Sequence, residues 1–415
     1  MIQIFLSLSL FIFVLSLLIV TLRDRYGYLS IFFSLYFILI LIIPAYFHVN
    51  NNIFPFYGLS YEYSDQLSAS IILLVFTVFF WLSFFLTPNK SLIKRRETNK
   101  SLDKFRFMYV IWSVLLILTI SLFFYGLNIF LTNRGDSYSG SLSDNSTTRE
   151  LLLTFLRSGS FFAMFFLLIY KKFVSKLYWY FTFLWAFILF FIFNYPLALS
   201  RFLFFSYLIL LFCYFVTPSK VSKFSVITIF VFGITTLFPF FSYVTRGEGN
   251  FLESLNGYYQ NSGDFDGFQS IINAVIYTSN VGYSLGNQIS SSLFSFIPRS
   301  IWLGKAEPTG SITAAAAGYD FLNISSPLPA EFFVDFSYVG LIFFSTILGI
   351  AFKKIDSLVL TSGKQELRFI LSIILISLIP ILSRGSILAV INIFYAELII
   401  CSLLYYLIFL KIKFK

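Results

Sequence analysis

The sequence predicts an all-α protein that crosses a membrane many times, and three observations carry this prediction. The chain of 415 residues is 58% hydrophobic, 21% aromatic and only 12% charged. Its apolar residues form repeated runs of about 20 residues, the length that an α-helix needs to span the hydrocarbon core. The alternating short strands of a membrane barrel are absent from the sequence. Because a helix satisfies its own backbone groups inside lipid, we interpret the runs as transmembrane helices.

We expect about eleven spans in one integral membrane domain, residues 1–415, with one large extracytoplasmic loop that contains short helices. The first run lacks the basic start and the small-residue cleavage site of a signal peptide, so it is interpreted as a helix. The expected spans are roughly 2–22, 28–47, 67–87, 107–131, 150–170, 177–194, 198–216, 224–244, 332–352, 369–383 and 386–410. The large loop is the segment 245–331, between the eighth and ninth spans.

The basic residues predict the orientation of these spans. Of the 29 Lys and Arg residues, 21 lie in short segments that alternate with segments poor in positive charge. Positive charge is typical of cytoplasmic loops, which places the N-terminus outside and the C-terminus inside the cell. The clusters are short and flank the spans, so the net charge of +10 reflects topology and does not indicate nucleic-acid binding.

The large loop carries its own helix signals. Asp264 or Asp266 is placed to cap a helix. The apolar face of that helix would be Phe268, Ile271, Ile272, Val275 and Ile276. Ala314 to Ala317 followed by Gly318 predicts a second short helix with a glycine stop. Pro327 and Pro329 lead into the ninth span, with Glu331 in its first turn.

Several kinds of chemistry are excluded by the residue inventory. His48 is the only histidine, so one chain cannot supply a two-histidine metal site, and we interpret His48 as an interfacial side chain at the end of a span. Cys213 and Cys401 both lie in apolar runs and indicate neither a disulfide framework nor a metal site. No nucleotide-binding glycine motif is present. We therefore expect no metal and no cofactor.

The positive signal comes from eight basic residues that depart from the charge bias, seven of them arginine. They are Arg134, Arg149, Arg157, Arg201, Arg246, Arg299, Lys305 and Arg384. Arg157, Arg201 and Arg384 lie at similar depth in the outer ends of spans, where a charge is costly unless it is paired or hydrated. Snorkelling is the alternative for each of them singly. Together they predict a shared cavity for an anion, and a diphosphate would suit the guanidinium fork.

Two of these arginines share a spacing. Arg246 is followed by ten residues and then Gly257, and Arg299 is followed by ten residues and then Gly310. We interpret each unit as a hairpin-like or short helical loop. In this interpretation the glycine allows an unusual backbone turn while the arginine points at the site.

With these motifs the chain resembles the O-antigen or oligosaccharide repeat-unit polymerases of the Wzy type. The resemblance lies in the span layout, in the two Arg-x10-Gly units and in three segments: 296–305, 329–340 and 382–386. It implies a multi-span, GT-C-like fold and a metal-independent, inverting glycosyltransferase. One feature departs from the family pattern, because both Arg-x10-Gly units lie in one loop here.

The resemblance implies a substrate and roles for particular residues. Donor and acceptor would both be oligosaccharides on undecaprenyl diphosphate, joined at the outer face of the inner membrane into an O-antigen or capsule. A chain-length regulator and a flippase are compatible further partners. Catalysis is assigned to Arg201, Arg299, Arg384 and Glu331, and substrate binding to Arg157, Arg246, Lys305, Asp335 and Glu248. Glu331, Asp335 and Glu248 are the candidates for a general base, although each is equally suited to capping a helix or pairing with an arginine.

Two alternatives remain open. An O-antigen ligase would use the same donor, but the resemblance leads us to expect a histidine in the large loop of a ligase, and 245–331 contains none. A flippase or other transporter would make no new bond. Such proteins typically have short loops, inverted repeats and broken helices.

Overall fold

The computed structural model describes residues 1–88, 103–131, 147–240 and 262–409. These residues divide into two compact units. Unit 1 comprises those within Met1–Lys94, Val216–Thr361 and Ile379–Ile391. Unit 2 comprises those within Arg95–Phe215, Ser362–Leu378 and Asn392–Lys415. Each unit is described by itself, and the prediction of one integral domain stays a prediction.

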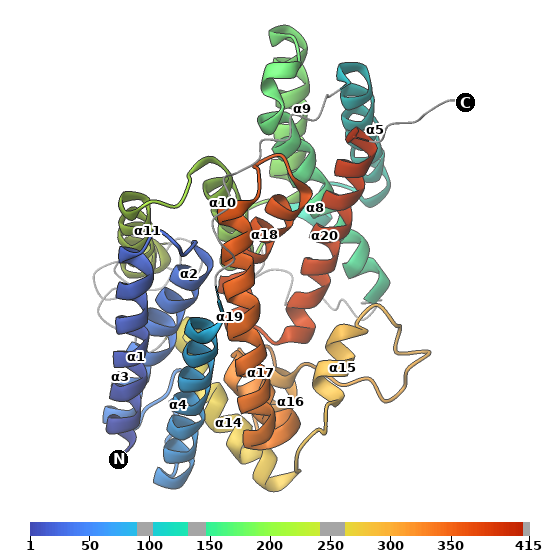
Figure 1. The fold of residues 1–415 in the computed structure, drawn as a ribbon. Helices are drawn as coiled ribbons and strands as arrows, with labels where there is room; N and C mark the ends of the chain where they lie inside the picture. Colours follow the sequence, from blue (N-terminus) through green and yellow to red (C-terminus); the bar gives the residue numbers. More distant parts are fainter. Residues whose placement is uncertain (89–102, 132–146, 241–261, 410–415) are drawn as a thin grey trace. The chain divides into compact units, whose positions relative to one another are not determined.

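Within the described residues every regular element is a helix, which confirms the all-α multi-pass class (Figure 1). In this described part of the chain, nine helices are long and apolar enough to cross a membrane. They are α1 (Ile2–Leu22), the continuous run Leu29–Asn51 formed by α2, η1 and α3, α4 (Tyr63–Leu86), α5 (Lys104–Tyr125), α8 (Thr147–Ile169), α9 (Lys176–Phe193), the run Lys220–Phe240 that begins with α11 (Lys220–Phe232) and η3 (Gly233–Leu237), α17 (Leu328–Thr361) and α20 (Ile387–Phe409).

Two of the eleven expected spans are shorter than expected. The span expected at 198–216 is α10 (Arg201–Phe215), and the span expected at 369–383 is α18 (Leu367–Ser377) followed by α19 (Ile379–Arg384). Proline explains the second interruption. Pro380 has no backbone N–H to donate, so the helix ends before it and a new short helix begins. Neither α10 nor α18 reaches the length of about 20 residues that a simple crossing requires.

The core of unit 1 is built from aromatic side chains between helices. Phe33 stacks edge-on against Phe352 of α17 with ring centroids 5.0 Å apart, and Phe80 of α4 lies 4.6 Å from Phe33. Gly349 lets α17 approach α4 closely, because a Cβ at this position would meet the backbone oxygen of Phe80. Small residues serve this purpose in lipid, where helices associate through close packing.

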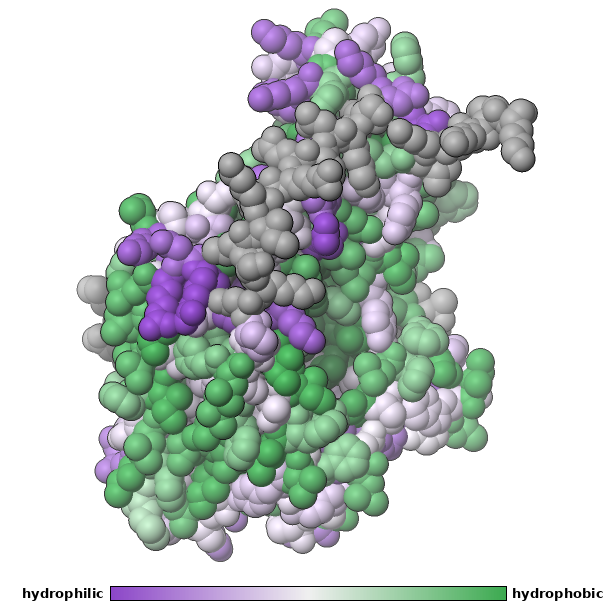
Figure 2. Space-filling model, viewed as in Figure 1, coloured by the Kyte–Doolittle hydropathy of each residue, from purple (hydrophilic) through white to green (hydrophobic). Residues whose placement is uncertain are grey.

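Contacts inside unit 1 define two ends. At the loop end, the Gln3 amide donates to Asn50 (2.7 Å), and Phe56 N donates to Gln269 (3.0 Å), so the N-terminus, the 52–62 turn and the 262–327 segment lie together. At the basic end, the Lys223 ammonium donates to the carbonyls of Val20 (3.0 Å) and Arg23 (2.7 Å). The flank of α1 and α4 is largely hydrophobic, and hydrophilic residues gather near the end of α1 opposite the N-terminus (Figure 2).

The described part of the large loop contains η4 (Gly263–Phe265), α14 (Gly267–Asn280), α15 (Asn287–Leu293) and α16 (Thr309–Ala316). The helices expected after Asp266 and before Gly318 are therefore confirmed. Gly318 has φ +76°, the left-handed conformation of a glycine stop. The ninth span also begins at the Pro327–Pro329 segment, with Glu331 in the first turn of α17. Residues 245–261 lie outside the described part of the chain.

Unit 2 contains α5, α6 (Asn128–Leu131), α8, α9, α10, α18 and most of α20. Indole and hydroxyl groups join its helices: Trp112 donates to Thr182 at 3.0 Å, and Trp179 donates to the carbonyl of Leu167 at 2.9 Å. Glu397 of α20 is fully buried, and neither of its carboxylate oxygens has a hydrogen-bond partner among the described residues.

Candidate functional site

The loop end of unit 1 holds three buried carboxyl side chains and a half-buried arginine that come from distant parts of the sequence. Asp264 and Asp266 precede α14, Glu331 lies in the first turn of α17, and Arg384 ends α19. Asp264, Asp266 and Glu331 are each less than 5% exposed. We call these four residues the loop-end cluster. Burying charges is expensive unless they are paired, so their gathering calls for a reason.

Arg384 is held by the loop. Its Nη2 donates to the carbonyl of Gly263 at 2.8 Å, and its Nη1 lies 3.4 Å from Oδ1 of Asp264. Its Nε lies 4.0 Å from Oδ1 of Asp266. The Arg384 side chain is 26% exposed, whereas the two carboxylates are almost fully enclosed. The guanidinium therefore lies at the boundary of the cluster, with a carboxylate on two sides.

Asp266 occupies the N-cap position of α14, but its side chain does not cap that helix. Instead its Oδ2 accepts a hydrogen bond from the backbone N–H of Ser325 at 2.9 Å. The hydroxyls of Ser270 and Ser325 are 3.0 Å apart beside it. Burial raises the pKa of Asp266, and the nearby Arg384 charge acts in the opposite direction. Asp266 thus joins α14 to the segment before α17. The sequence predicts that Asp264 or Asp266 caps α14, but the side chain of Asp266 does not.

Glu331 is 1% exposed and lies beside the hydroxyls of Thr309 and Ser326 and the backbone N–H of Ile387. Its Oε1 forms no hydrogen bond of good geometry with any described residue. Ser326 links this carboxyl to Arg384, because Ser326 N donates to the Arg384 carbonyl at 2.8 Å. Glu331, one of the three candidates for a general base, is therefore buried close to the backbone of Arg384 and Ile387.

Asp335 has a structural task at the point where α17 bends. Its carboxylate accepts from Gln288 N at 3.1 Å and from Ile289 N at 2.8 Å, which caps the first turn of α15. Directly after it, Phe336 and Ser337 have non-helical backbone angles, and Ser337 has φ +59°. A left-handed non-glycine residue is unusual and costs free energy, so this bend is held by its surroundings. Asp335 remains a predicted substrate-binding residue that here binds backbone.

Arg299 and Lys305 brace the loop between α15 and α16. Arg299 donates to the carbonyls of Lys305 and Ala306, each at 2.8 Å, and lies 3.0 Å from Glu307. The Lys305 ammonium donates to the carbonyls of Ser295 (2.6 Å) and Ile297 (2.9 Å). Burial lowers the pKa of Lys305. The hydrogen bonds of both side chains thus go mainly to the backbone of the loop itself.

Gly310 serves a different purpose from the one expected. It lies inside α16 and has no left-handed backbone angle. A Cβ at this position would lie 2.6 Å from the carbonyl oxygen of Ile324, so glycine is required for close approach between α16 and the segment before α17. The expected unusual turn at Gly310 is therefore corrected to a close contact. The companion unit, Arg246 to Gly257, and also Glu248, lie outside the described residues.

Arg157 and Arg201 belong to unit 2. Arg201 is the first residue of α10, where the helix dipole favours an anion over a cation. Arg157 lies in α8, close enough to Tyr207 to interact with it electrostatically, as does Glu397. The convergence of Arg157 and Arg201 with Arg384 on one cavity stays a prediction.

The sequence reasoning did not assign Asp264, Asp266, Thr309 or Ser326 to the site. The available signal was the pair of acids two residues apart, which was interpreted as a helix start only. Among the described residues no three His, Cys, Asp or Glu side chains are grouped so that they could hold a metal ion.

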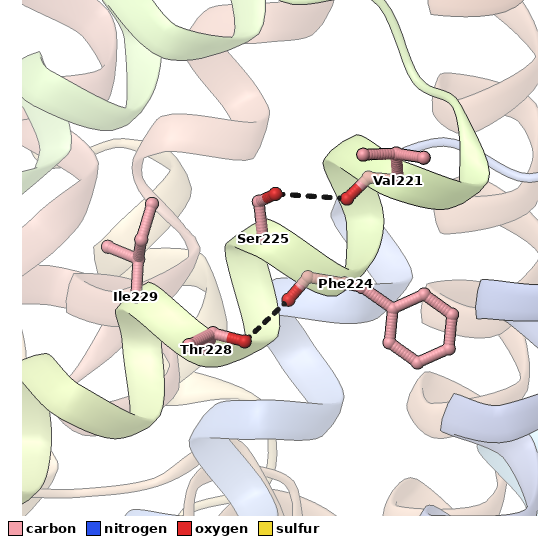
Figure 3. Close-up of a pocket in the computed structure, with 5 residues that line it drawn as sticks. All are labelled: Val221, Phe224, Ser225, Thr228 and Ile229. Carbon is pink, nitrogen blue, oxygen red and sulfur yellow. Dashed lines mark hydrogen bonds between the residues drawn. The ribbon is translucent and has the colours of Figure 1, made fainter.

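A shallow hollow on α11 lies away from this chemistry. It is lined by Val221, Phe224, Ser225, Thr228 and Ile229 (Figure 3). Ser225 donates to the carbonyl of Val221 at 3.0 Å and Thr228 donates to that of Phe224 at 3.1 Å. Both hydroxyls are thus used within the helix, and the hollow begins at the basic end of unit 1. It carries no role in the site.

The loop-end cluster can act on a polar substrate in two ways. Its arginine offers a guanidinium fork to an anionic group, and its carboxyls can accept a proton in a partly dry setting. Comparison with family models, with curated proteins and with solved structures finds no match to this chain.

Proposed function

We propose that this chain polymerises oligosaccharide repeat units carried on undecaprenyl diphosphate, as a metal-independent, inverting membrane glycosyltransferase. The single observation that supports it most is the loop-end cluster, which gathers Arg384, two aspartates and Glu331 under the loop helices of a multi-span protein. An ionisable group in such a place is a functional-site hypothesis by default. The loop end would face outward, the basic end the cytoplasm.

The proposed reaction uses the cluster as follows. A hydroxyl oxygen of the acceptor sugar attacks the anomeric carbon of the donor, and the bond from that carbon to the diphosphate oxygen breaks. The bonding electrons leave with undecaprenyl diphosphate, and the hydroxyl proton passes to a carboxylate, for which Glu331 is our assignment. Arg384 would release Asp264 and Asp266 and bind the departing diphosphate instead, because the negative charge of the diphosphate increases in the transition state.

The experiment is reconstitution of the full chain in liposomes with a purified lipid-diphosphate oligosaccharide. The expected product is a ladder of longer glycans on the lipid. Arg384→Ala and Arg384→Lys should each lose the ladder, because a point charge does not reproduce the fork. Arg134→Ala and Arg149→Ala serve as controls and should retain it. A ladder of full length from Arg384→Ala would contradict the assignment of Arg384.

Two other functions would give different results in the same assay. A ligase would move the glycan to another acceptor and make no ladder. A transporter is favoured by one observation, the break in α17 at Phe336 and Ser337, since discontinuous helices are typical of transporters. A transporter would change the side of the membrane on which the substrate lies while leaving its length unchanged.

A further inference from the structure

The segment 281–303 of the large loop exposes large apolar side chains although it lies outside the candidate spans. Leu303 is 89% exposed, Leu285 78% and Ile301 76%. We call the exposed apolar side chains of this segment the apolar rim: Val281, Tyr283, Leu285, Leu293, Phe294, Phe296, Ile301 and Leu303. In Figure 2 hydrophobic residues are visible on the surface of the α15 region. An exposed apolar surface of this extent marks an interaction site.

The pattern in this segment is inverted relative to a water-exposed loop. Several of its polar side chains are buried: Gln288 is 3% exposed, Ser291 0% and Ser292 1%. Ser291 accepts a hydrogen bond from Ala306 N at 2.8 Å, so its hydroxyl is used internally. Residues 281–298 contain no Asp, Glu, Lys or Arg. Polar groups inside and apolar groups outside are what a surface in contact with lipid requires.

The position of the segment along α17 places it at the edge of the hydrocarbon. Ser284 N donates to the Val334 carbonyl and Leu285 N donates to the Asp335 carbonyl, each at 2.9 Å, so the start of the rim is fastened at the bend of α17. At the basic end, the Lys353 ammonium lies 3.8 Å above the ring of Tyr26, which follows α1. From Ser337 to Lys353, α17 spans about 24 Å at ~1.5 Å per residue. A hydrocarbon core is about 30 Å thick. The rim therefore lies near its outer boundary.

The rim is also continuous with the lipid-facing side of the span. Beyond the bend, α17 exposes Val339 at 77% and Phe343 at 57%. Trp302, within the segment, is of the residue type that concentrates at the membrane interface. From these observations we propose that the apolar rim is an interfacial element that inserts its side chains among the acyl chains of the outer leaflet.

The test measures depth with a fluorophore. In the full chain with Cys213→Ala and Cys401→Ala, both cysteines being buried, Leu303→Cys is labelled with an environment-sensitive dye in liposomes. Asp320→Cys, an exposed polar site of the same loop, is the matched control. Lipids spin-labelled near the headgroup should quench the dye at 303 several-fold more than at 320, and aqueous iodide should show the reverse order.

A second measurement uses the native chain. Brominated lipids should quench tryptophan emission less in Trp302→Phe than in the unsubstituted protein, because the interfacial indole is then absent. The proposal is overturned if iodide quenches positions 303 and 320 alike, which would place the rim in water. It is also overturned if neither quencher reaches position 303 and the emission changes with the protein-to-lipid ratio, which would indicate that a second copy covers the rim.

Discussion

Unit 1 buries charged side chains at both of its ends, but the two ends give these side chains different partners. At the basic end, Lys223 donates to the carbonyls at the C-terminus of α1. Asp356 accepts from Leu29 N at 3.0 Å and from the Ser30 hydroxyl at 2.8 Å. At the loop end, Asp264 and Asp266 flank Arg384, and Glu331 keeps one carboxylate oxygen without a well-formed hydrogen bond to any described residue.

The difference separates anchoring from chemistry. Lys223 satisfies carbonyls at a helix C-terminus, and Asp356 satisfies the N–H groups at the start of α2, so both complement helix ends. The Lys353 ammonium also lies at the basic end, 3.8 Å above the ring of Tyr26. A buried charge whose hydrogen bonds are all made within the fold stabilises it. A buried carboxyl such as Glu331, with one oxygen that makes no well-formed hydrogen bond, destabilises the fold. Such a destabilised group is expected where a substrate supplies the missing partner.

The largest expected effect is on activity, from Glu331→Gln. Losing a general base lowers a rate by about a hundredfold or more, whereas the isosteric amide keeps the packing. We expect glycan ladders to disappear in the liposome assay, while thermal unfolding in detergent stays within a few degrees of the parent protein. If the Glu331→Gln variant polymerised glycan at the rate of the parent protein, the buried charges of the loop end would stabilise the fold only, like those of the basic end.

The next effect is on stability, from Asp356→Ala. Removing one partner from a buried charged group costs about 3–5 kcal/mol, because the partners that remain are left unsatisfied. We expect markedly earlier thermal unfolding. Folded protein that is recovered at low temperature should still polymerise. Loss of polymer with an unchanged unfolding temperature would remove the proposed distinction between the two ends.

Arg299→Ala tests the same distinction inside the loop. Both carbonyl bonds of Arg299 are lost in this variant, at about 1 kcal/mol each for half-buried hydrogen bonds. We expect faster proteolysis of the 294–307 segment, and Arg299→Lys should protect it only in part. If Arg299→Ala abolished polymer with the segment as resistant as in the parent, the arginine would act directly on substrate.

The smallest expected effect is a pH dependence carried by Asp266. Burial raises its pKa in the folded state. A raised folded-state pKa contributes stability that is fully present below the ordinary aspartate pKa and is lost as the pH rises through the folded pKa. Asp266→Asn removes this contribution, so its unfolding temperature should fall less steeply with rising pH than that of the parent. Parallel curves would show that Asp266 titrates alike in both states.

The helical class and most helix positions followed from the sequence, because a hydrocarbon slab demands only length and low polarity. The Pro380 break shortened one expected span, and α10 proved to begin only at Arg201. The partners of Arg384 did not follow. Gly263 and Asp264 lie about 120 residues before it, and no periodicity links a loop carboxylate to a distant helix end. Asp266 illustrates the same limit, since a residue well placed to cap α14 instead binds Ser325 N.

Local composition was enough to predict a multi-pass membrane chain, the approximate position of most of its helices, and which segments carry positive charge. Which buried charges bind backbone groups, and which do not, is a property of the packed fold. The same holds for the surface of 281–303, where Ser291 and Ser292 are buried while Leu285 and Leu303 are exposed. Such choices depend on what packs against each side chain, and packing joins residues that the chain keeps far apart.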